Sequence, residues 1–170
     1  MSKSGKTDGN LKAAFAGESQ ANRRYLAFAS KAEADGYKNV AKLFRAAAEA
    51  ETVHALSHLR VMGGVKRTAD NLVTAVEGET HEFNEMYPQF IAEAEAEGRR
   101  EALVGFKWAN KVEEVHAGLY RKALEAVKSG KDMAVSECFV CQVCGNTVEG
   151  KAPDVCPICG APASKFKRVD

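Results

Sequence analysis

The chain has 170 residues, 45% of them hydrophobic, which is enough for one compact domain and a small second one. Its 24 basic and 23 acidic residues nearly cancel, so we expect neither a nucleic-acid partner nor binding to an anionic membrane. No apolar run approaches the ~20 residues that span a bilayer, and the polar start lacks the apolar stretch of a secretory signal. We therefore expect a cytoplasmic protein, where reduced cysteines favour metal binding over disulfides.

Hydrophobic residues at alternating three- and four-residue intervals predict a bundle of four helices. We expect them at about Thr7–Asp35, Lys38–Met62, Asn71–Glu97 and Arg99–Lys128. A glycine follows each segment and can supply the left-handed residue that ends a helix. Thr68 or Asp70 is the candidate cap at the start of the third helix.

The second pair of helices repeats the first. Residues 28–36 match residues 90–98 at a distance of 62, but upstream the distance is 61, because Gly17-Glu18-Ser19 matches Gly78-Glu79-Thr80. The third helix therefore contains one extra residue between Glu79 and Phe90. An extra residue inside a helix is commonly absorbed as a π-bulge, and Pro88 also disturbs the hydrogen bonds there, so we predict a bulge or kink.

Acidic side chains stand in the middle of all four predicted core faces. Even after the protein relaxes, burying a carboxylate without a counter-charge costs roughly several kcal/mol. A pair of divalent metals would supply that counter-charge. A Glu from each of two helices plus Glu-x-x-His from the other two is the pattern of ferritin-like di-iron or di-manganese bundles. The candidate metal ligands are Glu18, Glu51, His54, Glu79, Glu82, Glu113 and His116. The competing interpretation is an alanine-rich bundle whose acidic faces are solvated.

Two tyrosines lie within about two turns of these ligands. Tyr25 and Tyr87 are either ordinary core aromatics or partners that hydrogen-bond the ligand carboxylates.

All five cysteines lie between residues 138 and 159. Cys141-x-x-Cys144-Gly and Cys156-x-x-Cys159-Gly predict four thiolates in a tetrahedral array, which suits zinc or iron, and the spacing alone does not decide between them. We interpret Cys138 as a free thiol because no glycine follows a Cys138–Cys141 pair. Domains are therefore predicted at residues 1–135, a ferritin-like bundle, and 136–170, a four-cysteine module of strands and loops.

These motifs resemble the rubrerythrin family over nearly the whole chain. The resemblance rests on Gly17-Glu18-Ser19-Gln20-Ala21-Asn22, Glu51-x-x-His54, Gly78-Glu79-Thr80-x-Glu82 with Met86-Tyr87-Pro88, Glu113-x-x-His116, and a rubredoxin-like tail from Phe139 to Phe166. It implies a di-iron pair in the bundle and a single iron in the tail, although zinc can enter either site in a preparation.

The resemblance also implies a function: reduction of hydrogen peroxide to water in oxidative-stress defence. Glu51 and Glu113 would bridge the irons, with Glu18, Glu79 and His116 as terminal ligands. One iron would exchange Glu82 for His54 on reduction, and these two residues, with Tyr25 and Tyr87, are the candidate catalytic residues. Ala21 occupies the position equivalent to Glu82, so the two irons would differ.

Electrons would pass from the tail to the bundle. The resemblance implies an external donor, a rubredoxin- or reductase-like protein linked to NADH. It further implies a homodimer or higher homo-oligomer in which the tail of one subunit approaches the bundle of the other.

Three alternative functions remain open from the sequence. A ferroxidase or iron-storage bundle would share the di-iron ligands but has no need of a four-cysteine tail. A non-enzymatic zinc-ribbon adaptor would bind zinc in the tail. A dioxygen-dependent oxidoreductase would use the same di-iron ligands with a different oxidant.

Overall fold

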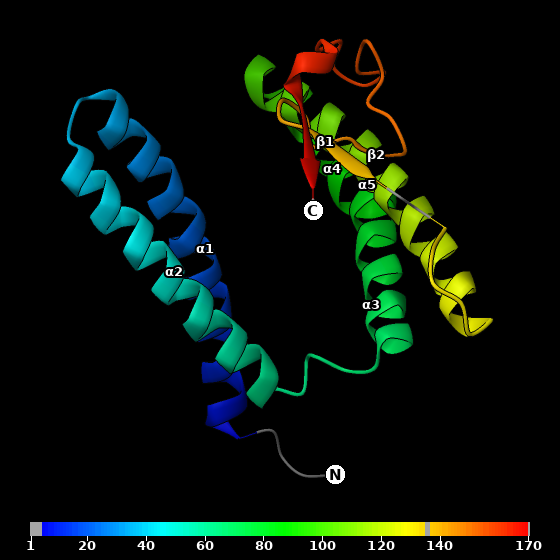
Figure 1. The fold of residues 1–170 in the computed structure, drawn as a ribbon, viewed down its shortest axis with the longest axis horizontal. Helices are drawn as coiled ribbons and strands as arrows, with labels where there is room; N and C mark the ends of the chain where they lie inside the picture. Colours follow the sequence, from blue (N-terminus) through cyan, green and yellow to red (C-terminus); the bar gives the residue numbers. More distant parts are fainter. Residues whose placement is uncertain (1–4, 135–136, 170) are drawn as a thin grey trace. The chain divides into compact units, whose positions relative to one another are not determined.

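The structure, a computed structural model, describes residues 5–134 and 137–169. The chain divides into two compact units, Met1–Lys66 and Arg67–Asp170. The first is a helical hairpin, and the second combines the remaining helices with the cysteine-rich module (Figure 1). The domain boundary predicted between residues 135 and 136 lies outside the described residues and stays a prediction.

The first unit consists of α1 (Lys6–Ala34) and α2 (Lys38–Val61), which lie side by side in Figure 1. Small side chains make their interface: Ala29, Ala41 and Ala48 are almost fully buried. Alanine lets the two backbones approach closely, because it adds only a methyl group to the contact. Both helices were predicted within one residue of the bounds observed.

The second unit begins with a helix that is interrupted at the expected place. It comprises α3 (Thr68–His81), the π-helix η1 (Glu82–Met86) and α4 (Tyr87–Ala96), which pack on α5 (Arg100–Lys128). The π-helix confirms the predicted bulge. Pro88, at the start of α4, has no N–H to continue an α-helical ladder, so the irregular turn ends there.

The predicted cap of the third helix is wrong. Arg67 stands at the N-cap position, and no side chain caps the helix. Asp70 instead accepts a hydrogen bond from the Arg67 side chain, with Nε 2.8 Å from Oδ2. The ion pair occupies the carboxylate that a cap would have used.

Each unit contains the same cluster of three aromatic rings. In the first, Tyr25 and Phe28 of α1 meet Phe44 of α2; in the second, Tyr87 and Phe90 of α4 meet Phe106 of α5. The Phe28–Phe44 and Phe90–Phe106 ring centroids are both 5.6 Å apart. The sequence repeat is therefore also a repeat of packing.

The cysteine-rich module is a small antiparallel sheet with the order β2-β1-β3. Its strands are β1 (Cys138–Cys141), β2 (Thr147–Glu149) and β3 (Phe166–Val169), and a short 3₁₀ helix, η2 (Ala163–Lys165), precedes β3. The buried core is Cys141, Cys156 and Ala161, with Ile158 and Phe166 packed against it. Such a small core needs a metal to hold it.

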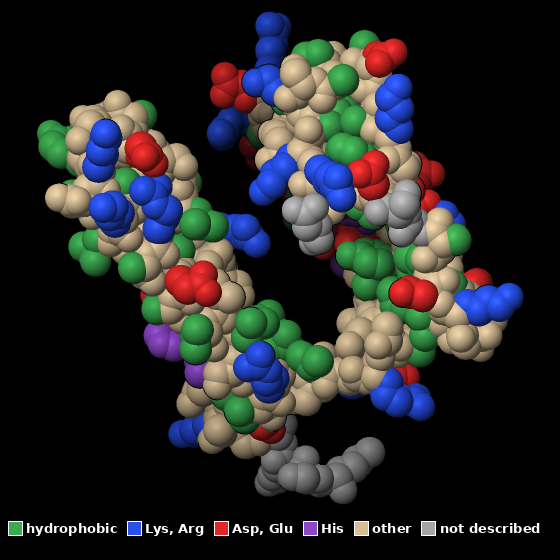
Figure 2. All heavy atoms as spheres, viewed as in Figure 1, with side chains coloured by type: hydrophobic (Ala, Val, Ile, Leu, Met, Phe, Trp, Pro, Cys, Tyr) green, Lys and Arg blue, Asp and Glu red, His purple; other side chains and the backbone are tan. Residues whose placement is uncertain are grey.

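Several large apolar side chains stay exposed on the helices. Leu43 and Val61 of α2 are 70% and 68% exposed, and Val104 of α5 is 45% exposed. Figure 2 shows hydrophobic side chains reaching the surface among charged ones. No helix in the described part of the chain is long and apolar enough to cross a membrane.

Candidate metal centres

The hairpin of α1 and α2 brings three predicted ligands together. Glu18 of α1 meets Glu51 and His54 of α2, with one ligand atom from each lying within 4.8 Å of the others. His54 follows Glu51 by three residues, so one helix face carries both, and its Nδ1 lies 3.0 Å from Glu51 Oε2. A hydrogen bond with Glu51 raises the pKa of Glu18 and lowers that of Glu51, as expected for two carboxyls sharing a proton.

The second unit repeats this triad with more burial. Glu79 of α3 meets Glu113 and His116 of α5, again within 4.8 Å. His116 Nδ1 lies 2.8 Å from Glu113 Oε2 and 4.0 Å from Glu79 Oε2. Burial, followed by the hydrogen bond and charge of Glu113, raises the pKa of Glu79. A divalent cation would relieve the repulsion between these carboxylates.

Glu82 is placed by the π-helix next to the second triad rather than within it. It lies in η1, three residues after Glu79, and is half-buried. Burial first, and then the charges of Glu113, Glu82 and Glu79, raise the pKa of Tyr87. The Tyr87 phenol therefore stands among three carboxylates and keeps its proton at neutral pH. Tyr25 occupies the corresponding place in the hairpin's aromatic cluster.

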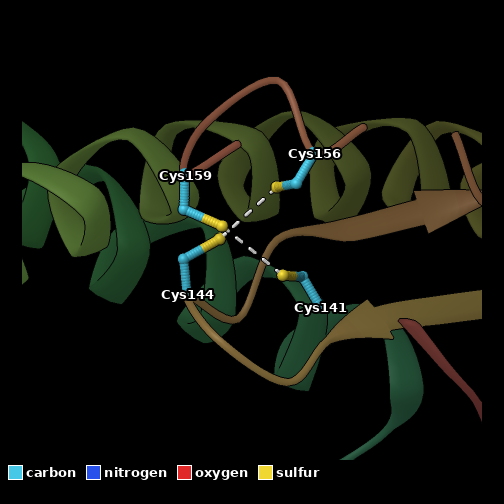
Figure 3. Close-up of side chains that lie close together, drawn as sticks. All are labelled: Cys141, Cys144, Cys156 and Cys159. Carbon is cyan, nitrogen blue, oxygen red and sulfur yellow. Dashed lines mark hydrogen bonds between the residues drawn. The ribbon is translucent and has the colours of Figure 1, made fainter. Parts of the chain in front are cut away.

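The four-cysteine site is formed by two matching turns. Cys141, Cys144, Cys156 and Cys159 converge from two loops, as Figure 3 shows. Gly145 and Gly160 follow the second cysteine of each pair with φ of 87° and 77°, a conformation that favours glycine. Their amides donate to the carbonyls of Cys141 and Cys156. Cys138 is not part of this cluster.

The sulfur spacing fits a tetrahedral metal ion. Sγ of Cys141 lies 3.7 Å from that of Cys159, and Sγ of Cys144 lies 3.6 Å from that of Cys156. Metal–sulfur bonds of about 2.3 Å in a tetrahedron require sulfurs about 3.8 Å apart. Burial opposes ionisation of Cys156, but amide donors from Cys159 and Ile158 lower its pKa to about 7, which prepares one thiolate.

The cysteine module packs on α5 beside the second triad. Thr147 Oγ1 of β2 lies 2.9 Å from His116 Nε2, and Glu149 of β2 pairs with Lys122 of α5. A Cβ on Gly145 would lie 3.7 Å from Val112 Cγ1, so that loop sits at van der Waals distance from the helix. The module thus contacts a helix of its own chain, and the approach of the tail to another subunit, which the resemblance implied, stays a prediction.

Sequence reasoning did not identify two polar residues of this region. Thr147 contacts His116, and Asn146, which is 2% exposed, directs Nδ2 toward Cys156 Sγ at 3.9 Å. No spacing rule marks either residue, because each acts through the folded contact between module and helix. Their place directly after Cys144-Gly145 was the only signal available.

The donor sets fit iron. Carboxylate oxygens and imidazole nitrogen suit first-row divalent metals in a ferritin-like bundle, and four thiolates suit iron or zinc. Each triad alone supplies two carboxylates and one imidazole, which is half of the ligand set of a two-metal centre.

Comparisons with known proteins agree with both sites. The sequence model of the rubrerythrin family matches residues 9–124, and that of the rubrerythrin rubredoxin-like domain matches residues 139–167. Rubrerythrin-2 of Clostridium acetobutylicum is 34% identical over 171 aligned residues, covering 92% of this chain and 93% of that protein. Nigerythrin of Nitratidesulfovibrio vulgaris is 36% identical and covers 95% of this chain and 86% of its own.

A solved structure is similar as well. Nigerythrin in a mixed-valence state matches with a TM-score of 0.55 and 32% identity, covering 99% of this chain and 88% of the other. These likenesses and the two kinds of ligand cluster agree on a di-iron ligand set and a rubredoxin-like four-cysteine site.

Proposed function

Because this chain belongs to the rubrerythrin family, a group of di-iron oxidative-stress proteins, we propose that it is a peroxidase that reduces hydrogen peroxide to water. One observation carries the proposal: the four-cysteine module contacts a ligand of the second triad through Thr147. A pair of bound ferrous ions would supply the two electrons that peroxide needs. The Glu and His residues of the triads would hold the metals, and groups beside them would deliver protons.

We assign the metal-binding roles that the family resemblance implies to the residues of the triads. Glu51 and Glu113 would bridge the two metals, while Glu18, Glu79 and His116 would be terminal ligands. Glu82 and His54 would exchange as ligands of one iron. Two features support this exchange: Glu82 lies in a π-helix, where backbone hydrogen bonding is irregular, and the His54 side chain is 55% exposed, which leaves it room to turn.

Proton delivery is assigned to the tyrosines, chiefly Tyr87. Reduction of one peroxide to two waters consumes two electrons and two protons. Tyr87 lies among Glu79, Glu82 and Glu113, and its raised pKa keeps the phenolic proton available for donation. Tyr25 would play the matching part beside the first triad.

We propose that electrons reach the triads through the module. Gly145, Asn146 and Thr147 connect Cys144 covalently to the hydrogen bond with His116. An external donor protein of rubredoxin or reductase type, linked to NADH, would reduce the module. A cytoplasmic location suits four thiols that are arranged for metal.

We further propose a homodimer in which two chains share their hairpins. Six residues separate α2 from α3 and span at most about 25 Å, whereas the 24 residues of α2 measure about 36 Å. Ferritin-like bundles join their two hairpins by one long crossover, for which this linker is too short. A second copy would supply the missing hairpin and cover exposed apolar residues such as Leu43.

Stopped-flow absorbance tests the proposed activity. Anaerobically reduced, iron-loaded protein is mixed with hydrogen peroxide while the iron–thiolate absorbance is followed. We expect this absorbance to reappear, with two electrons consumed per peroxide. No oxidation by peroxide, or equally fast oxidation by dioxygen, would favour the storage or oxidase functions instead.

Mixing two inactive variants tests the exchange of hairpins. Glu51→Ala disables the first triad and Glu113→Ala the second. Coexpressed chains that exchange hairpins form one dimeric centre with both triads intact, so iron binding at the di-iron centre returns. Chains that close on themselves never combine two intact triads, and the mixture stays without that iron. Molecular mass in solution gives the oligomer order.

A further inference from the structure

His116 has a close polar partner at each ring nitrogen. Nδ1 lies 2.8 Å from Glu113 Oε2, and Nε2 lies 2.9 Å from Thr147 Oγ1. Thr147 belongs to β2 of the cysteine module, so this ring joins the two metal sites of the second unit. Which nitrogen carries the proton decides which one binds metal.

The Thr147 hydroxyl determines that proton's position. Its Oγ1 donates to the carbonyl oxygen of Gly145 at 3.3 Å, and a carbonyl can only accept. A hydroxyl has one hydrogen; when Thr147 gives it to Gly145, Thr147 accepts from His116 and Nε2 carries the N–H. In the neutral ring, Nδ1 then presents a lone pair toward Glu113 and Glu79. Three acceptors with no proton between them suit a cation.

His54 lacks this arrangement in the hairpin. Its Nδ1 lies 3.0 Å from Glu51 Oε2, as in the other triad. No hydrogen bond to its Nε2 is formed by the described residues 5–134 and 137–169. The His54 side chain is 55% exposed, and that of His116 is 26% exposed. Both rings thus contact a glutamate through Nδ1, but only His116 has a close polar partner at Nε2 among the described residues.

We propose that Thr147 is a positioning residue, which fixes the tautomer and orientation of His116 so that Nδ1 is a permanent metal ligand. Within the hairpin itself, the described residues give His54 Nε2 no such partner. The inference rests on the proposed function in taking His116 and His54 as metal ligands.

This role makes the second triad dependent on the docked module. Lys122 and Glu149 pair across the contact, and the Gly145 loop lies against Val112. Thr147 is three residues after the ligand Cys144, so a metal that orders the cysteine turn also sets the position of the hydroxyl. Loss of the tail metal would therefore loosen His116.

Zinc-loaded protein tests the proposal without any redox chemistry. Thr147→Val keeps the side-chain shape and removes the hydroxyl, and Thr147→Ser restores it. Outer hydrogen-bond partners of metal-binding histidines are typically worth ~10–100-fold in affinity, so we expect T147V to weaken zinc binding at the triads within that range. T147S should bind like the wild type. Chelator competition measures the affinities.

Nitrogen-15 NMR of the same samples reads the tautomer directly. We expect a slowly exchanging Nε2–H on His116 in the wild type and T147S, fast exchange of that proton in T147V, and unchanged His54 signals throughout. A proton on Nδ1 in the wild type overturns the inference, whether or not the variants fold. Unchanged zinc affinity in T147V, or a T147S as weak as T147V, overturns it too. Absent peroxide turnover would leave these results unaffected and would count only against the proposed function.

Discussion

The two Glu-Glu-His triads have the same kinds of ligand, and one inserted residue apart they have the same sequence spacing, but their surroundings differ. The first belongs to a plain hairpin of two uninterrupted helices. The second is bordered by the π-helix with Glu82, by Tyr87 and by the cysteine module. A repeated metal motif thus becomes two inequivalent sites through what is added around it, and the ligands themselves need not change.

The largest effect should come from removing the module's metal. Cys156→Ser takes one of four sulfurs, so we expect the iron–thiolate absorbance to vanish and the small sheet to lose its order. NMR signals of His116 should then shift, whereas those of His54 should not. Cys138→Ser is the matched control, because Cys138 lies outside the cluster. A persistent tail spectrum would mean that the ligand register is wrong.

A second test removes the acidic residue found in only one half. We expect Glu82→Ala to leave the helices folded and to slow peroxide turnover by roughly 100-fold, as for loss of a group that handles protons or a metal at the site. Glu85→Ala, at the exposed side of the same π-helix, should have no effect. Turnover unchanged in E82A would contradict the ligand exchange.

The two tyrosines provide a smaller, paired comparison. Tyr87→Phe should slow turnover by about tenfold, the value of one lost hydrogen bond, because the phenol stands among three carboxylates. Tyr25→Phe should slow it less, since Ala21 takes the place of Glu82 in the hairpin. Turnover rates of the two variants, measured at saturating peroxide, test this order. A larger loss in Y25F would reverse the assignment of the main proton donor.

The smallest expected effect is on the stability of the metal-free protein. Burial raises the pKa of Glu79, so its ionised form opposes folding, and this cost grows as pH rises from the unfolded pKa through the folded one. Glu79→Gln should raise the melting temperature at pH 7 by about 2–4 °C, the shift that roughly 1 kcal/mol gives a chain of this size. The gain should disappear below the unfolded pKa.

Glu18→Gln is the matched control for that experiment. The pKa of Glu18 is also raised, chiefly through its hydrogen bond with Glu51, but the pKa of Glu51 is lowered in return. The two shifts oppose each other, and the pair is solvent-accessible. We therefore expect a smaller gain than in E79Q, measured by the same thermal scans; an equal gain would remove burial as the explanation.

Much of the fold was predictable from local patterns. Helix positions followed from apolar periodicity and terminal glycines, and one extra residue between Glu79 and Phe90 was enough to predict the π-helix. The four-cysteine cluster also forms as its spacing predicted. These features depend on residues close together in the sequence, so a pattern rule captures them.

The features that could not be predicted depend on contacts between distant segments. Thr147 meets His116 across 31 residues of sequence, and nothing in its own surroundings marks it. Likewise, Arg67 removes Asp70 from the role of a cap through a pairing that propensity alone does not weigh. The ligand roles of the individual glutamates and histidines remain predictions.

The π-helix η1 shows how one inserted residue can change a helix locally and leave the repeat around it intact. Glu18 and Glu79 align at a distance of 61 residues, while Tyr25 and Tyr87 align at 62. The added residue is therefore absorbed within Glu82–Met86, and the groups on both sides keep their register. The inserted residue therefore changes the backbone of the segment that carries Glu82, whose counterpart in the first half is Ala21, without shifting the ligands and tyrosines on either side out of the repeat.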